Sequence, residues 1–380
     1  MRFLHTADWH LGRLFYRQHL TDDQAEVLKQ LTRLIADTRP DALVIAGDIY
    51  DRAVPSADAV ALLDGFLTTV VRQLGVTVIA IAGNHDSPDR LAFGSRLLAE
   101  QRLHVRGEPS AEAEPVVLPD NHGPVLLYPL PYAEPAYVRE RLGDESVVDH
   151  DTAMAALTGR IRAAHPPGTR SVLVAHAFIS GGEASESERP LAIGGSEWVA
   201  RERFSGFGYV ALGHLHRAQR AGADSVRYAG SLMKYSFSEA HHRKSISLVE
   251  MNARGECSVE TIELKPSRDV RIIRGGLAHL LAGPAPGESA EDYLLAELTD
   301  RGALLDPMGR LRQVYPNLMH IDRTEFGGAS AGYERRDTSG LTVEELFREF
   351  LLQVSGEELT AEEREELEGA VRAVAGGDDE

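Results

Sequence analysis

Five apolar segments of this sequence end in side chains that can bind metal ions. The residues at these ends are Asp8, His10, Asp48, Asn84, His176, His214 and His216. They offer oxygen and nitrogen donors and no sulfur, a set that suits divalent manganese, iron or zinc. We therefore predict a centre that holds two divalent ions.

The predicted centre needs an anion between its ions, because two cations about 3.5–4 Å apart repel each other. Asp48 has two carboxylate oxygens and is the natural bridge. We expect the other donors to bind one ion each: Asp8, His10 and His216 bind the first ion, and Asn84, His176 and His214 bind the second. With one hydroxide and two carboxylates, a formal charge of about +1 remains, which attracts a phosphodiester.

Two further residues are candidates for catalysis. His85 follows Asn84 and is free to donate a proton or a hydrogen bond to a leaving oxygen. Asp51 comes three residues after Asp48 and is in reach to orient His85 or a water molecule. Each short motif alone is weak, since such residues often serve turns and cores. Their joint occurrence at five strand ends is what favours a hydrolytic metal centre.

The residues before these ends predict buried strands, because they form short apolar runs rich in β-branched side chains. The runs cover residues 2–7, 41–46, 76–82, 171–175 and 209–212. Helices are predicted from about residue 21 and over about 57–74, and helical connections imply parallel pairing by right-handed crossovers. The carboxyl ends of parallel strands line one crevice in an α/β sheet, so the five ends can converge.

Downstream the pattern changes. Short alternating strands over 225–263 predict a second sheet, and Lys265-Pro266 marks a boundary. Asp306-Pro307 predicts a helix start, with a capping side chain and proline at the first helical position. We expect four parts: a catalytic domain over 1–268, a small α+β capping domain over 269–324, a glycine-rich flexible linker over 325–340 and a helical partner-binding segment over 341–380.

The last segment predicts two helices. Thr342–Glu345 and Thr360–Glu363 fit capping boxes. Apolar side chains follow helical spacing in the first helix: Val343, Leu346, Phe347, Phe350, Leu351 and Val354. Two short helices cannot bury this stripe between themselves, which favours a partner-binding module. The alternative is a helical hairpin that folds back on the catalytic domain of its own chain.

Composition narrows the class of protein. The chain of 380 residues is 43% hydrophobic and can bury a sizeable core. Its one cysteine, Cys257, excludes an intramolecular disulfide and indicates a reducing compartment. Residues 1–12 predict a strand and turn rather than a signal peptide, and no apolar run reaches the length of a membrane span. We therefore expect a cytoplasmic protein.

The net charge of −18 is concentrated at the C-terminus. From Leu341 onwards, 13 acidic and 3 basic residues give −10, which leaves −8 for the first 340 residues. Such a body does not wrap nucleic acid electrostatically. A DNA substrate would have to be attracted by bound cations and by a partner.

The five strand ends, in this order, resemble the calcineurin-type metallophosphoesterase superfamily. Longer motifs are similar to those of the SbcD family of bacterial nuclease subunits, over essentially the whole chain. These motifs are Ala7–Arg13, Ser185–Leu191, Tyr209–His216, Met308–Arg312 and Tyr315–Asn317.

This resemblance implies an α/β fold with a two-sheet sandwich flanked by helices, a small α+β capping domain and a C-terminal helical pair. It implies a homodimer, two Mn²⁺ ions, DNA as substrate and a partner ATPase, SbcC, whose coiled coil binds residues 341–380. The implied activities are ATP-dependent double-strand exonuclease, single-strand endonuclease and hairpin opening in DNA repair and recombination. The seven donors match the family's metal ligands and His85 its catalytic histidine. Relatives from archaea and eukaryotes carry histidine where Asp51 stands, so its role stays open.

Two other functions compete with this one. A small-molecule phosphoesterase acting on cyclic or nucleotide diesters would use the same metal site, but it needs neither the segment after Lys265 nor the acidic tail. A non-catalytic scaffold that keeps the fold should have lost ligands, whereas all seven donors and His85 are present.

Overall fold

The computed structural model describes residues 1–188, 198–302, 304–323, 342, 345–348 and 359–375. The chain forms two compact units, Met1–Val270 and Arg271–Glu380. The predicted linker, residues 325–340, lies outside the described residues.

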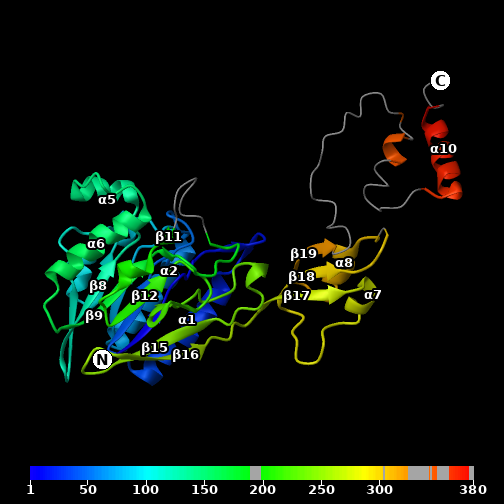
Figure 1. Ribbon diagram of the computed structural model, residues 1–380. Coiled ribbons are helices and arrows are strands. Elements are labelled where there is room, and N and C mark those ends of the chain that lie inside the picture. The colour runs from blue at the N-terminus through cyan, green and yellow to red at the C-terminus, as the bar shows by residue number, and fades with distance from the viewer. Residues whose placement is uncertain (189–197, 303, 324–341, 343–344, 349–358, 376–380) are drawn as a thin grey trace. The chain divides into compact units, whose positions relative to one another are not determined.

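Two mixed six-stranded sheets are the framework of the first unit, and Figure 1 shows its strands and the helices that flank them. The first has the order β16–β15–β1–β4–β5–β6, and these strands cover Cys257–Glu263, Ser245–Met251, Arg2–Thr6, Ala42–Ala46, Thr77–Ile81 and Leu103–Arg106. The second has the order β13–β14–β12–β9–β8–β7, covering Gln219–Ala221, Ala223–Tyr228, Tyr209–Gly213, Arg170–His176, Gly123–Leu130 and Val116–Asp120. Strands β1, β4, β5 and β6 run parallel, as do β14, β12, β9 and β8. The predicted α/β sandwich is confirmed.

The second sheet was predicted wrongly in one respect. Residues 225–263 do not form a sheet of their own: β14 joins β12, whereas β15 and β16 extend the first sheet. The physical reason is the edge of β1, whose backbone groups need partners. Strand β15 supplies them through antiparallel pairing, with Arg2 opposite Glu250.

The core lies between the two sheets and beneath the helices. Fully buried side chains from both sheets form one cluster, including Phe3, Val44, Ile79, Val125, Val172 and Ala211. On the other face of the second sheet, helix α6 (His150–Ala164) packs Met154 and Leu157 with Leu173 and Val210. Strands β4, β5, β9 and β12 are buried along their whole length, which explains their uninterrupted apolar sequences.

Helices α1 (Thr21–Thr38) and α2 (Ala57–Thr68) connect the first parallel strands, as predicted. Helix α2 packs Phe66 edge-on against Trp9, with ring centroids 5.1 Å apart. The helix predicted over 57–74 ends as an α-helix at Thr68 and continues as a π-helical turn over Thr69–Gln73. This wider turn contains Val70, which is completely buried.

Shorter elements complete the first unit. They are the strands β2 (Leu14–Phe15), β3 (Gln18–His19), β10 (Phe178–Ile179) and β11 (Trp198–Val199), the helices α3 (Pro88–Leu91), α4 (Ser95–Ala99) and α5 (Pro135–Leu142), and the 3₁₀ turns η2 (Arg201–Phe204) and η3 (Phe237–Glu239).

The second unit contains a three-stranded sheet, β17–β18–β19, over Val270–Gly275, Tyr293–Leu298 and Leu318–Arg323; Val270, the first residue of β17, is the last residue of the first unit. Two short helices, α7 (Leu277–Leu280) and α8 (Pro307–Arg312), accompany it. The predicted start of α8 is confirmed, since the Asp306 side chain accepts a hydrogen bond from the backbone N–H of Gly309 at 3.0 Å.

The tail contains a helical turn over 345–348 and helix α10 (Ala361–Ala375). Thr342 and Glu345 exchange the two hydrogen bonds of a capping box, as do Thr360 and Glu363. Four residues of the predicted apolar stripe lie outside the described residues: Val343, Phe350, Leu351 and Val354. No helix within the described part of the chain combines the length and hydrophobicity of a membrane span.

Candidate metal centre

Strand register brings the predicted donors together. Ile45 pairs with Thr6 of β1, and Ala46 with Ile81 of β5, so these three strands end side by side. In the second sheet, His176 lies directly opposite Gly213. All seven donors thus sit at neighbouring strand ends. Asn84 is half-buried, and the other six are buried.

Two glycines permit this convergence. A Cβ atom on Gly83 would lie 2.2 Å from Asp48 Oδ1, and one on Gly47 would lie 2.3 Å from His176 Nδ1. Neither distance is possible for a real side chain. The loops after β4 and β5 can therefore approach each other and the second sheet only without side chains at these positions.

The backbone is strained where it presents the donors. Asp8, His10, Asp48 and His214 all have positive φ, at 53°, 45°, 50° and 108°. Such conformations cost on the order of 1–3 kcal/mol each and persist where surrounding bonds hold them. Those bonds are present: His10 N–H donates to Asp48 O at 3.0 Å, and His214 N–H to Asp8 Oδ1 at 2.9 Å.

One group of acceptors converges around His176. Its Nδ1 lies 2.9 Å from the carbonyl oxygen of Ala46, which can only accept, so Nδ1 carries the proton. The lone pair on Nε2 then faces Asn84 Oδ1 at 2.9 Å and Asp48 Oδ2 at 3.5 Å. His214 Nδ1 lies 3.3 Å from the same asparagine oxygen. His176 Nε2 and the two oxygens that it faces are acceptors without a proton between them, an arrangement that fits a bound cation.

A second group forms around His10. Its Nε2 lies 3.0 Å from His216 Nε2 and 3.7 Å from Asp48 Oδ2. The other ring nitrogen, Nδ1, is buried without a hydrogen-bond partner among the described residues; Asp51 Oδ1 is 3.6 Å away. Asp48 Oδ2 therefore lies near ring nitrogens of both groups. This position suits the bridge predicted from the sequence.

The buried carboxylates add to the need for positive charge. Burial raises the pKa of Asp8 well above its ordinary value, and the Asp48 carboxylate raises it further. Burial would also raise the pKa of Asp48, but His176 and His10 hold it well below its ordinary value. Two carboxylates in one buried site are stable together only with cations beside them. The donor set thus fits two divalent ions.

Asp8 lies close to the bridging residue Asp48 and to His176, a predicted ligand of the other ion. One oxygen of Asp8 lies within 4.8 Å of ligand atoms of Asp48 and His176, whereas the sequence placed Asp8 with the ion of His10 and His216. The assignment of Asp8 to one ion or the other stays a prediction.

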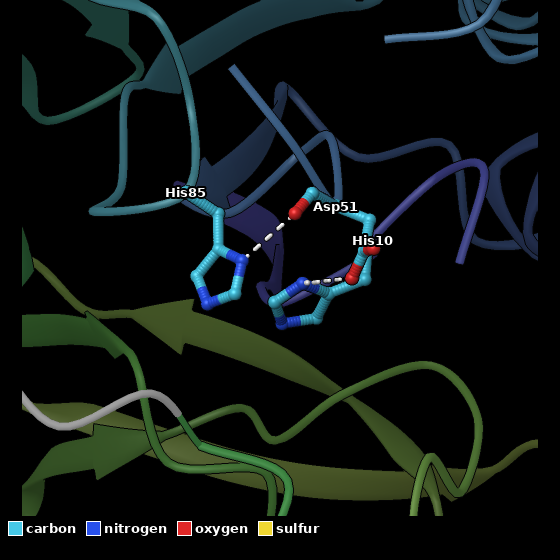
Figure 2. Close-up of side chains that lie close together, drawn as sticks. All are labelled: His10, Asp51 and His85. Atoms are coloured by element: carbon cyan, nitrogen blue, oxygen red, sulfur yellow. Dashed lines mark hydrogen bonds and ion pairs between the residues drawn. The ribbon is translucent and has the colours of Figure 1, made fainter. Parts of the chain in front are cut away.

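Figure 2 shows how His85 and Asp51 are related. His85 Nδ1 lies 2.9 Å from the backbone carbonyl oxygen of Asp51, so the backbone rather than the carboxylate orients this ring. The carboxylate instead accepts from Arg13 Nη1 at 2.8 Å and lies beside His10 (Figure 2). Burial would raise the pKa of Asp51, but His10 and Arg13 lower it to about 2.

Two buried residues that hold the loops were not predicted from the sequence. Asp86 accepts hydrogen bonds from the backbone N–H groups of Gly83, Ile49 and Tyr50, at 2.9, 3.1 and 2.9 Å, and so ties the loop after β5 to that after β4. Its place at the end of Gly-Asn-His-Asp was the available signal. Gln24 Nε2 donates to the carbonyl oxygen of His10 at 2.7 Å, a contact that nothing in the sequence indicates.

Comparisons with known proteins agree with this geometry. Residues 1–218 match the family model of calcineurin-like phosphoesterases, and residues 266–355 match the SbcD_C model, described as the type 5 capsule protein repressor C-terminal domain. The SbcD subunit of the SbcCD nuclease from Staphylococcus saprophyticus is 31% identical over 375 residues, which cover 98% of each chain.

A solved structure is similar to a lesser degree. The crystal structure of TT1561 of Thermus thermophilus covers 68% of this chain and 98% of its own, at 17% identity and a TM-score of 0.37, a likeness too weak to indicate more. The assignment rests on the matched residues and the curated relative: the chain belongs to the calcineurin-like phosphoesterase family and, within it, to the family of SbcD nuclease subunits.

Proposed function

We propose that this chain is a metal-dependent DNA phosphodiesterase and the nuclease subunit of a complex with an SbcC-type ATPase. The observation that carries the proposal is the convergence of His10 Nε2 and His176 Nε2 on Asp48 Oδ2, at 3.7 and 3.5 Å. Membership of a family with nuclease subunits supports DNA as the substrate.

The roles of the residues follow from their contacts. Asp8, His10, Asp48, Asn84, His176, His214 and His216 would hold the two ions, for which we propose Mn²⁺. When bound, such ions lower the pKa of water and stabilise charge on phosphoryl oxygens. The Asp51 carbonyl fixes His85 Nδ1, which leaves Nε2 as the atom that serves the leaving oxygen. The carboxylate of Asp51 would hold the side chains of His10 and Arg13 in place, since its Oδ1 lies 3.6 Å from His10 Nδ1 and 2.8 Å from Arg13 Nη1.

The finer activities are part of the same proposal. We propose ATP-dependent exonuclease activity on double strands and endonuclease activity on single strands and hairpins, in DNA repair and recombination, by a homodimer in the cytoplasm. A chain with a net charge of −18 repels DNA, so the bound ions and the ATPase must attract the substrate. We therefore propose that extended duplexes are degraded only with the partner.

Incubating the purified chain with Mn²⁺ and either a hairpin oligonucleotide or cyclic nucleotides tests this function. We expect cleavage of the hairpin, and stimulated degradation of duplex ends when the ATPase and ATP are added. Hydrolysis of cyclic nucleotides with no cleavage of DNA would instead identify a small-molecule phosphoesterase.

Deleting residues 341–380 should separate nuclease chemistry from partner binding. Leu346 and Phe347 of the tail are each 41% exposed, on an acidic background that suits a basic groove or coiled coil. We expect Mn²⁺-dependent hairpin cleavage to stay nearly intact. Affinity for the ATPase should fall about tenfold or more, because apolar anchors carry most of the energy of such contacts, and ATP-stimulated exonuclease activity should fall with it.

Two controls support the interpretation of this deletion. Replacing exposed polar residues of α10, Arg364→Ala and Glu365→Ala, should leave ATPase binding unchanged. Leu346→Asp with Phe347→Asp in the full chain should reproduce the deletion. Loss of folding on deletion, or unchanged binding of the ATPase, would show instead that the tail belongs to the body of the protein.

A further inference from the structure

Behind the His10 group lies a buried polar network that involves a motif without an assigned role. Ser187, from the motif Ser185–Leu191, places its Oγ 2.7 Å from His216 Nδ1. Glu239, the last residue of η3, is completely buried, and its Oε1 lies 3.2 Å from the same nitrogen. The Ser187 hydroxyl also hydrogen-bonds to this carboxylate oxygen. Two segments distant in sequence thus meet at one ring nitrogen.

These contacts determine which nitrogen of His216 carries the proton. A carboxylate only accepts, so the single proton of the Ser187 hydroxyl points to Glu239. The hydroxyl oxygen therefore accepts from His216 Nδ1, and Nδ1 is protonated. The opposite nitrogen, Nε2, then has a lone pair directed at His10 Nε2, 3.0 Å away. The network thus leaves His216 Nε2 unprotonated and able to bind a metal ion beside His10.

Lys244 holds the other side of the network. Its ammonium group contacts Glu239 Oε2 and donates to the carbonyl oxygen of His216 and to Ser231 Oγ, both at 2.8 Å. Glu239 thus has an ammonium group beside Oε2 and the Ser187 hydroxyl and His216 Nδ1 beside Oε1, partners that favour the charged form of a carboxylate. Glu239 is thereby a charged acceptor, and the same lysine fixes the backbone of His216.

We infer that Glu239 is a positioning residue of the metal centre, which acts with Ser187 to hold His216 in the tautomer whose Nε2 binds metal, while Lys244 balances its charge. This inference rests on the proposed function, since it takes His216 as a ligand. Carboxylates that accept a hydrogen bond from a metal-binding histidine orient the ring and make it a stronger ligand. Such an arrangement cannot be found by motif spacing, because Ser187, His216 and Glu239 belong to separate segments.

A purely structural ion pair is the competing explanation. The same unit contains a suitable control, since Asp120 forms a pair with Arg170 at the start of β9, whereas His176 ends that strand. Asp120→Asn weakens a largely buried pair without touching a predicted ligand. Glu239→Gln makes the same chemical change beside His216. A structural role predicts similar behaviour of both variants, and a positioning role does not.

Two measurements on the full chain test the inference. In the metal-free protein, ¹⁵N resonances of histidine rings, assigned with His216→Asn, should show a protonated Nδ1 for His216 in the wild type and a mixture of tautomers in Glu239→Gln. In Mn²⁺ titrations, affinity at one of two sites should fall about 10- to 100-fold in Glu239→Gln. The other site, and both sites of Asp120→Asn, should be unchanged.

The double variant Glu239→Gln, Lys244→Met guards against simple misfolding, because it leaves no uncompensated buried charge. The double variant should be thermally more stable than Glu239→Gln, while the weakened Mn²⁺ site stays weak. If Glu239→Gln does not fold, the same measurements are made on the double variant. Failure of the wild type to bind Mn²⁺ would refute the proposed function itself. Two strong sites in a folded Glu239→Gln or double variant, or an unchanged tautomer of His216, would overturn the inference alone.

Discussion

Asp48→Asn should weaken the binding of both metal ions together. Asp48 Oδ2 lies 3.7 Å from His10 Nε2 and 3.5 Å from His176 Nε2, so one oxygen serves both groups of donors. A neutral amide cannot screen two neighbouring cations. We expect Mn²⁺ titration to show both sites weakened, and DNA hydrolysis to fall by about a thousandfold or more, equivalent to several kcal/mol of transition-state stabilisation.

The fold should survive this substitution. The other oxygen of Asp48 accepts the backbone N–H of His85 at 2.9 Å, and an asparagine oxygen can accept the same bond. Asp8→Asn is the matched control, because Asp8 accepts from His214 N–H and its replacement likewise keeps an acceptor. We expect Asp8→Asn to weaken chiefly one site. Two tightly bound ions in Asp48→Asn would rule out the bridging role.

The general position of the site could be predicted from sequence because parallel strands obey simple rules. Strands buried on both faces have uninterrupted apolar sequences, and their carboxyl ends meet at one edge. The register of β1, β4 and β5 produces this arrangement, because Asp8, Asp48 and Asn84 follow the paired ends Thr6, Ala46 and Ile81 within three residues. The same rules could not predict that β15 pairs with the edge of β1. An antiparallel strand needs no helical crossover, so the sequence contains no pattern that indicates which strand it joins.

Contacts made by the backbone or between distant loops could not be predicted. His85 is held by the carbonyl oxygen of Asp51, and every residue type has such an oxygen, so the contact has no sequence signal. Asp86 holds two loops through three backbone N–H groups, which depend on the turn conformation after β5. The link between Glu239 and His216 depends on tertiary packing of segments that share no periodic pattern.

His85→Ala should separate metal binding from proton donation. The ring is held through Nδ1 by a backbone carbonyl group, so its loss removes no predicted metal ligand. We expect both Mn²⁺ ions to remain, whereas DNA cleavage falls by about a hundredfold or more, the contribution of a well-placed general acid. His122→Ala, at an exposed turn between β7 and β8, is the control for removal of a histidine and should keep full activity.

The leaving group distinguishes proton donation from mere positioning. A nitrophenyl phosphodiester releases a phenolate that needs little protonation, so His85→Ala should lose much less activity on this substrate than on DNA. Equal losses on both substrates would mean that His85 acts before bond cleavage, for example by orienting the phosphate. Loss of one metal ion in the variant would place His85 among the ligands. Wild-type turnover of DNA by the metal-replete variant would show that His85 has no part in the mechanism, because proton donation, phosphate orientation and metal binding by this ring would each be lost in the variant.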